Sequence, residues 1–259
     1  MKADKKIYLP RLCVRYNILG EKEYYPVIGK KKNIVVNVFS QGVNSVRQEK
    51  IHRYLHKHLI PNNAVVEGVD EIVCVCPYDG DLPQDIIGLD ESVPSNSHLL
   101  GMHGFCYDTV LQGRLNNNWQ SVIYKAANYR CAFGLQFSVL MDARRCEAVE
   151  AVRLNRITTL NMQLSGIPTI QTVSLTSPRF YDVAYAGLAP NAPVAFENVC
   201  SLKDKTKRLL FRSGIEELMI RKSPSMLIVV GNRLDFDPGV PVVYYKSRIQ
   251  RIRSHEYGK

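Results

Sequence analysis

The sequence contains no run of 18 or more apolar residues, the length that a membrane-spanning helix needs. It also lacks the apolar stretch of a secretory signal, because Lys2, Lys5 and Lys6 are followed by a mixed polar segment. These two absences predict a protein that stays in the cytoplasm and has no membrane partner.

Cysteine is too scarce and too scattered to indicate a disulfide framework. The seven cysteines are an odd number spread from Cys13 to Cys200, a pattern that favours reduced, mostly buried thiols. Tryptophan occurs once, at Trp119, where we expect it to pack in the core. Hydrophobic residues make up 46% of the 259 residues, which is enough for a substantial core.

Positive charge is absent from residues 62–113, a stretch with nine carboxylates and no lysine or arginine. The ends of the chain are basic instead. Residues 1–60 contain 13 basic and 4 acidic side chains, and residues 201–259 contain 13 and 6. With a net charge of +10, this asymmetry indicates basic surfaces for a polyanion such as nucleic acid, although basic ends also serve solubility.

Two basic clusters are the candidates for phosphate contact. They are Arg47, Lys50, Arg53 and Lys57 on the outer face of a helix predicted over residues 44–59, and Arg248, Arg251 and Arg253 in the tail. A charged helix face is more often simply solvated. We expect the tail to contribute more to binding, because it has few apolar residues to bury and its arginines can hold phosphates bidentately.

Short apolar runs alternate with helical patterns from residue 132 to residue 231. The runs have the length and composition of buried strands and cover Ala132–Leu140, Ile167–Val173, Pro193–Val199 and Met226–Val230. Between the first two, a helix is predicted from an N-cap at Asp142 to a terminating Gly166. The alternation predicts an α/β fold whose sheet is mostly parallel with crossover helices, either an open sheet or an irregular TIM-like barrel.

The flanking segments have weaker patterns. Residues 6–25 are typical of a strand and a turn, Asn33–Phe39 of a buried strand, and residues 77–94 of a loop. Because residues 232–239 are too few for a helical crossover, we expect Val240–Tyr245 to pair antiparallel or at a sheet edge. The predicted organisation is an N-terminal α/β extension over residues 1–99, an α/β core over 100–245 and a basic tail over 246–259.

Patterns that would identify a metal site are incomplete. His52 and His56 lie at i and i+4 of the predicted helix but have no third ligand at a recognisable spacing. Cys74 and Cys76 alternate along an expected strand, so they should face opposite sides. The acidic loop that begins near Asp79 lacks the glycine and the terminal glutamate of a calcium loop. The metal, if any, stays unknown from the sequence.

Ligand sites in parallel sheets form at the carboxyl ends of the strands. Three carboxylates at or just after predicted strand ends, Asp108, Asp142 and Glu197, could act as acid and base or share a metal ion. Structural roles are the alternative, because Asp108 and Asp142 are also suitable helix caps. Other polar residues at these ends form an expected strand-end pocket: Ser138, Gln171, Thr172, Asn198, Asn232 and Arg233.

The order and spacing of several short motifs carry a resemblance. They include His103–Asp108, Phe137-Ser138, Leu154-Asn155-Arg156, Gly166-Ile167-Pro168, Pro193-Val-Ala and Val229-Val-Gly231. Over roughly residues 100–232 the chain resembles the uncharacterised family called domain of unknown function 4417. Members of that family occur in bacteria, phages and other mobile elements, so the resemblance implies a mobile-element protein without implying an activity. The chain departs from the family pattern at Gln136, Leu175 and Cys200, where the family tends to have Asp, Trp and Gly.

Three functional classes follow from these patterns. The first is a phage or mobile-element protein of unknown activity that associates with nucleic acid through its basic ends. The second is a metal-dependent phosphodiester hydrolase or nuclease that uses the strand-end carboxylates, and only this class requires Mg²⁺ or Mn²⁺. The third is a virion-associated or protein-binding component. The sequence leaves the choice between an enzyme and a binding protein open, and it does not specify the oligomeric state.

Overall fold

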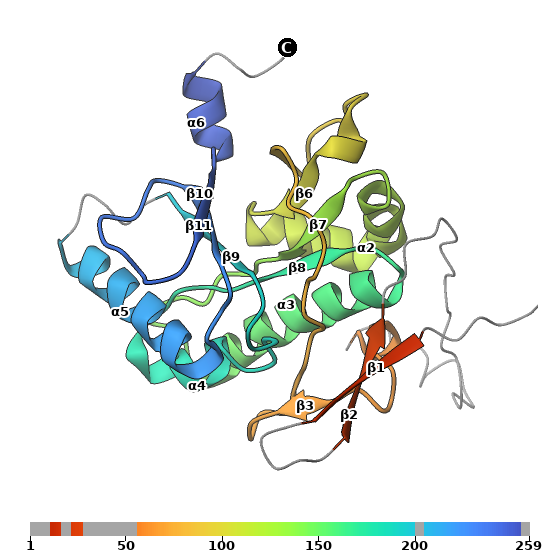
Figure 1. The fold of residues 1–259 in the computed structure, drawn as a ribbon, viewed down its shortest axis with the longest axis horizontal. Helices are drawn as coiled ribbons and strands as arrows, with labels where there is room; N and C mark the ends of the chain where they lie inside the picture. Colours follow the sequence, from red (N-terminus) through yellow and green to blue (C-terminus); the bar gives the residue numbers. More distant parts are fainter. Residues whose placement is uncertain (1–10, 17–21, 28–55, 200–204, 255–259) are drawn as a thin grey trace, which may run out of the picture.

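The structure is a computed structural model that describes residues 11–16, 22–27, 56–199 and 205–254 (Figure 1). The predicted strand at 33–39 and most of the predicted helix at 44–59 lie outside the described residues, and so do Arg47, Lys50 and Arg53. The end of that predicted helix is a short 3-10 helix, η1 (Lys57–Leu59).

Seven parallel strands form the main sheet, and their order in the sheet is their order in the sequence. The strands are β5 (Ile86–Gly88), β6 (Gly101–Gly104), β7 (Cys131–Leu135), β8 (Thr169–Thr172), β9 (Val194–Asn198), β10 (Leu227–Gly231) and β11 (Val242–Tyr245). The sheet curls into a half-barrel with helices between its strands (Figure 1). The predicted α/β fold with a parallel sheet is therefore confirmed.

The helices that connect the central strands cover the outer face of the sheet. They are α2 (Asp108–Ala126), α3 (Arg145–Leu164), η3 (Pro178–Phe180) with α4 (Tyr181–Ala184), and α5 (Lys205–Lys222). A last short helix, α6 (Arg248–Arg253), follows β11 and extends beyond the end of the sheet (Figure 1). None of the helices in the described ranges is both long and apolar enough to cross a bilayer.

Smaller elements lie outside the main sheet. A hairpin pairs β1 (Arg11–Tyr16) with β2 (Lys22–Val27), as the strand-and-turn pattern predicted. A second antiparallel pair joins β3 (Val66–Glu67) to β4 (Ile72–Val73), and η2 (Ser97–Leu99) leads into β6.

Apolar residues fill both faces of the curled sheet. On the outer face, Trp119 of α2 and Ile157 of α3 pack in one cluster, and Ile215 of α5 packs with Phe196 of β9 in another. The inner face has its own core, in which Phe133 of β7 meets Tyr245 of β11 edge-on with ring centroids 6.3 Å apart. Burial on both faces explains why the strands appear in the sequence as continuous apolar runs rather than as alternating patterns.

The prediction that residues 77–94 are only a loop was wrong. Ile86–Gly88 forms β5, which pairs with Gly101–His103 of β6 and is one edge of the main sheet. Three residues are too few to produce a periodic signal in the sequence. The strand is defined instead by its hydrogen bonds to β6. The predicted domain boundary after residue 99 falls between these two hydrogen-bonded strands.

The expected antiparallel pairing of Val240–Tyr245 was also wrong, whereas its edge position was right. β11 lies at the other edge of the sheet and pairs with β10 in parallel, with Leu227 opposite Val242. Residues 232–241 carry the chain back to the amino end of the sheet without a helix. Residues 232–241 can span roughly 30 Å, about twice the length of β10, so a parallel return does not require a helix.

Helix α3 begins two residues later than predicted, and Asp142 is not its cap. Asp142 is exposed in the turn before the helix. The N-cap is Arg144, whose backbone N–H donates to the Glu147 carboxylate at 2.8 Å, in the manner of a capping box. The predicted terminator was correct, because Gly166 follows the helix with a φ of +80°.

Candidate functional site

The carboxyl ends of the parallel strands lie along one rim of the half-barrel, which we call the mouth. It consists of the strand ends and the segments after them, residues 88–91, 103–108, 136–138, 197–199, 231–233 and 245–253. Several of the polar residues predicted from the sequence lie here. Their individual environments differ. Some of these residues are engaged in hydrogen bonds that hold the fold together, and others have side chains that could act on a ligand.

Glu197 is the most unusual carboxylate of the mouth. It follows Ala195, a residue of the inner core, by two positions on β9, so its side chain points to the inner side of the sheet. The side chain reaches solvent at the rim, yet the surrounding chain removes enough water to raise the pKa of Glu197 from 4.5 to about 7. A carboxyl group with this pKa can accept or donate a proton near neutral pH.

Asp108 is held by the turn after β7. Both of its carboxylate oxygens lie 3.2 Å from the backbone nitrogen of Ser138, which donates to them, and the Ser138 hydroxyl donates to Oδ1 at 3.2 Å. The same turn is fixed from below by Asn155 of α3. Its Oδ1 accepts from the Phe137 N–H at 2.6 Å, and its Nδ2 donates to the Phe137 carbonyl at 3.1 Å. Asn155 therefore positions Ser138 beneath Asp108.

The next residue of the same family motif, Arg156, is a structural residue. It is 1% exposed, and its guanidinium donates to the carbonyls of Ala186, Thr172 and Ala184 at 2.7 to 2.8 Å. Burial lowers the pKa of Arg156 to about 10, which leaves it charged at neutral pH. This side chain ties the end of β8 to the segment after α4.

The pKa of the Cys106 thiol reflects the charged groups that surround it at the mouth. Burial raises its pKa to about 11, and the negative charges of Asp90, Asp108 and Glu197 add to this increase while Arg248 opposes it. These four charged groups come from the segment after β5, from α2, from β9 and from α6. All of them lie close enough to act on one thiol.

The remaining predicted pocket residues hold the scaffold together. Gln171 exchanges two hydrogen bonds with the backbone of Ala189, and Thr172 donates to the Leu135 carbonyl. Asn198 donates to the Asn232 carbonyl at 3.0 Å, Asn232 donates back to the Val199 carbonyl, and Arg233 stacks on the ring of Tyr244. Each of these polar groups is engaged by its own chain.

The three predicted catalytic carboxylates do not form a metal site. Within the described ranges, no three His, Cys, Asp or Glu side chains are grouped as a metal ion requires. Asp108 and Glu197 lie at the mouth, whereas Asp142 is exposed in the turn before α3. The structure therefore leaves Glu197 as a proton-transfer candidate and removes Asp142 from a shared ligand set.

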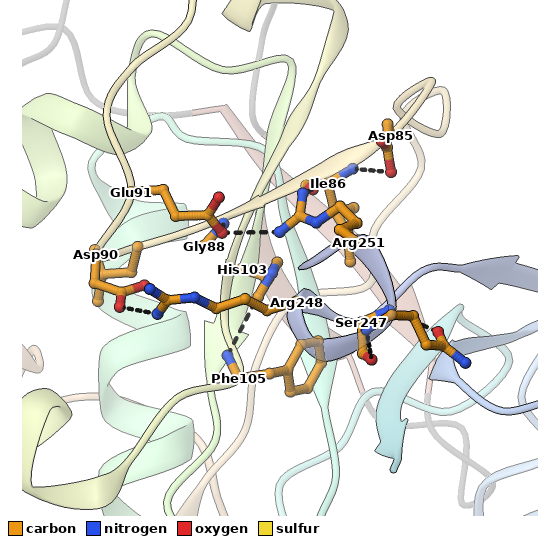
Figure 2. A network of polar contacts seen from close by, with 12 residues as sticks. Asp85, Ile86, Gly88, Asp90, Glu91, His103, Phe105, Ser247, Arg248 and Arg251 are labelled. Atoms are coloured by element: carbon orange, nitrogen blue, oxygen red, sulfur yellow. Dashed lines mark hydrogen bonds and ion pairs between the residues drawn. The ribbon is translucent and has the colours of Figure 1, made fainter. Parts of the chain in front are cut away.

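Two of the three C-terminal arginines, Arg248 and Arg251, are bound to the acidic segment after β5, so the expectation that the tail has little to bury was wrong for Arg251. Arg251 is 5% exposed and lies 2.8 Å from the Glu91 carboxylate (Figure 2). Arg248 forms an ion pair with Asp90, also drawn in Figure 2, and Arg253 remains exposed. These two ion pairs hold α6 against the acidic segment, which contains no basic residue of its own.

These contacts also complete the outer edge of β5. In a parallel strand, alternate residues point their backbone groups away from the neighbouring strand, and here they are Ile86 and Gly88. Arg251 donates to the Ile86 carbonyl, and the Gly88 N–H donates to Glu91 at 2.9 Å (Figure 2). Side chains therefore satisfy the edge that a further strand would pair with in a closed barrel.

His103 lies in the same network and was not predicted as a site residue. It is 2% exposed, and its Nδ1 accepts from the Phe105 N–H at 3.2 Å, so the proton of the neutral ring is on Nε2. Burial, and next the charge of Arg251, lower the pKa of His103 to about 3. Within the described part of the chain, His103 Nε2 and Arg251 Nε are buried nitrogens without a hydrogen-bond acceptor.

A half-barrel of seven parallel strands with a charged mouth defines the class of this protein. The chain matches the family described as Domain of unknown function (DUF4417) over residues 78–242, more than half of its length. It belongs to this family, as the resemblance of its motifs indicated. The matched segment contains β5 to β10 and the start of β11, and α6 lies beyond it.

A curated relative comes from a virus of bacteria. The Gene 1 protein of Mycobacterium phage D29 is 32% identical over 95 residues, which are 37% of this chain and 35% of the relative. The chain thus matches about a third of the length of that protein. No solved structure matches the chain.

Proposed function

We propose that this protein binds nucleic acid through phosphate groups at the mouth and serves a phage or related mobile element. The observation that supports this most is the position of α6. The helix and the short segment before it bring three exposed basic side chains, Lys246, Arg248 and Arg253, to the rim where the strands end. Guanidinium groups match the oxygens of a phosphate in a bidentate geometry.

An exposed aromatic residue at the same rim supports single-stranded nucleic acid as the ligand. Tyr107 is the N-cap residue of α2, in the segment after β6, and is 84% exposed. A tyrosine ring in this setting can stack on a base, and such stacking tolerates any sequence. Basic side chains and an exposed aromatic ring at one rim are the two features that proteins combine when they bind single strands without sequence preference.

The charge of the chain and its relatives agree with this proposal. The net charge of +10 favours association with a polyanion, and a phage protein shares part of its sequence with this chain. We keep the assignment of nucleic-acid binding to the tail that the sequence indicated, with one change. Arg251 is assigned to the scaffold, and phosphate contact is assigned to Arg248 and Arg253.

Fluorescence anisotropy of labelled single-stranded DNA and RNA tests the proposal. Tyr124, which lies on α2 and is 56% exposed, provides a matched control for Tyr107. Tyr107→Ala should weaken binding on the order of tenfold, since one stacked base contributes about 1–3 kcal/mol, and Tyr124→Ala should leave it unchanged. Absence of binding to either nucleic acid at low salt would contradict the function. Equal effects of the two substitutions would exclude the stacking role.

A second candidate function, proton transfer on a bound ligand, is favoured by the raised pKa of Glu197. General acid or base catalysis is most efficient when the pKa is near the working pH. Gel assays of nucleic-acid cleavage, with and without Mg²⁺ or Mn²⁺, test it. Glu197→Gln should abolish cleavage and keep binding. Binding without cleavage by the wild type would contradict this second function, and a failure of both activities would favour a virion-associated or protein-binding role.

A further inference from the structure

We infer that Asp90 competes within the molecule with nucleic-acid phosphate for the guanidinium of Arg248. This inference rests on the proposed function, because it concerns the regulation of the same site. In the structure the Asp90 carboxylate forms an ion pair with the Nη1 side of Arg248 (Figure 2). A carboxylate and a phosphate present the same kind of oxygen acceptor to a guanidinium, so the two exclude each other there.

The accessibility of this pair allows an exchange. The side chains of Arg248 and Asp90 are 43% and 26% exposed, so both contact solvent and can rotate. The neighbouring pair is different, because the side chains of Arg251 and Glu91 are only 7% and 13% exposed. One acidic side chain of the segment is therefore fixed, and the next is available for exchange.

The backbone around Asp90 is anchored, so the exchange needs only side-chain movement. Lys125 of α2 donates to the carbonyl of Leu89 at 2.7 Å and to the carbonyl of Glu91. These two contacts hold the chain on both sides of Asp90. A phosphate can thus replace the carboxylate without unfolding β5 or releasing α6.

A cavity beside Asp90 provides a place for the displaced carboxylate. The cavity has a volume of about 350 Å³ and is lined by Asp90, Arg114 and Lys125 among others. Arg114 is exposed on α2, and no ion pair of Arg114 occurs among the residues that the structure describes. When Asp90 leaves Arg248 it can turn towards Arg114, so that one ion pair is exchanged for another.

The network around Arg248 contains more hydrogen-bond donors than acceptors. This is a separate observation in favour of a ligand that brings an anionic oxygen. His103 lies beside Arg248 and Arg251 (Figure 2), and the charges of both arginines act on its ring. Two buried N–H donors, at His103 Nε2 and Arg251 Nε, have no acceptor within the described residues. Buried donors without acceptors are costly, so a phosphate oxygen that enters the network improves its balance.

The test measures anisotropy of the same labelled single strands with Asp90→Asn. We expect this substitution to tighten binding roughly two- to fivefold at low salt, which corresponds to the value of an exposed ion pair. The matched control is Asp81→Asn. It removes the same charge from another exposed ion pair, with Arg130 at 2.6 Å, at the amino end of the sheet. Asp81→Asn should change affinity by less than half as much on a logarithmic scale.

A double-mutant cycle tests the destination of the carboxylate. Arg114→Gln should weaken wild-type binding by a similar factor and have a smaller effect in the Asp90→Asn background. Equal affinities of the Asp90→Asn and Asp81→Asn proteins would overturn the competition while nucleic-acid binding by the wild type stands. Absence of binding by the wild type and all of these variants would overturn the proposed function itself. Circular dichroism and urea unfolding establish that each variant is folded.

Discussion

Arg251 and Glu91, which are 160 residues apart in the sequence, meet in an ion pair of 2.8 Å at the outer edge of β5. Both side chains are almost completely buried, and each also bonds to the backbone of β5. The pair joins the last helix to the first strand of the half-barrel. In this way the protein completes one sheet edge without a further strand.

Loss of Arg251 should be one of the most destabilising single changes in the described chain. Arg251→Met leaves Glu91 as a buried charge without its partner and the Ile86 carbonyl without its donor, so we expect a loss of about 3–5 kcal/mol. Urea unfolding followed by circular dichroism measures it. Arg253→Met, on the exposed side of the same helix, should cost less than about 1 kcal/mol. Equal losses for the two variants would mean that the ion pair does not hold α6.

Arg156 should be required for folding rather than for binding. Arg156→Met leaves three buried carbonyls without donors, each costing about 1–3 kcal/mol, so the loss in unfolding free energy should be at least about 3 kcal/mol. The control is Arg153→Met on the same helix, where the arginine is partly exposed and paired with Glu150, and there we expect about 1 kcal/mol or less. A loss of less than 1 kcal/mol for Arg156→Met would contradict the clamp.

The pKa of Glu197 makes stability depend on pH in a defined direction. Because the folded-state pKa is raised from 4.5 to about 7, the folded protein binds more protons than the unfolded chain between these pH values. The unfolding free energy of the wild type, relative to Glu197→Gln, should therefore fall as the pH rises from about 4.5 to 7 and then remain constant. Urea unfolding across this range measures the difference. A constant difference would show that Glu197 has an ordinary pKa.

Local patterns in the sequence were sufficient to predict the central strands and the helix α3. The runs that became β8, β9 and β10 are apolar because both faces of the sheet are buried, and α3 has helical spacing on one side. Glu197 and Asp108 could be placed at the mouth because strand ends follow from the runs. Where a pattern repeats over many neighbouring residues, as in these runs and in α3, the prediction agrees with the structure, whereas the single-residue prediction of a cap at Asp142 did not.

Contacts between distant segments could not be predicted in the same way. β5 is only three residues long and is defined by its pairing with β6. The binding of Arg248 and Arg251 to Asp90 and Glu91 leaves no periodic pattern in either segment. A signal was present nonetheless, since nine carboxylates in a stretch without lysine or arginine must be balanced from elsewhere in the chain.

The salt dependence of nucleic-acid binding tests the central claim most directly. Affinity for a labelled single strand is measured over a range of salt concentrations for the wild type and for the double variant Arg248→Gln, Arg253→Gln. The control is Arg212→Gln, Arg221→Gln, which removes two exposed arginines of α5 that pair with Glu216 and Glu217. Each lost phosphate contact lowers the slope of log affinity against log salt by about 0.7, so the α6 variant should lose about 1.4 and the control close to none. An unchanged slope for a folded α6 variant would contradict phosphate binding at the mouth.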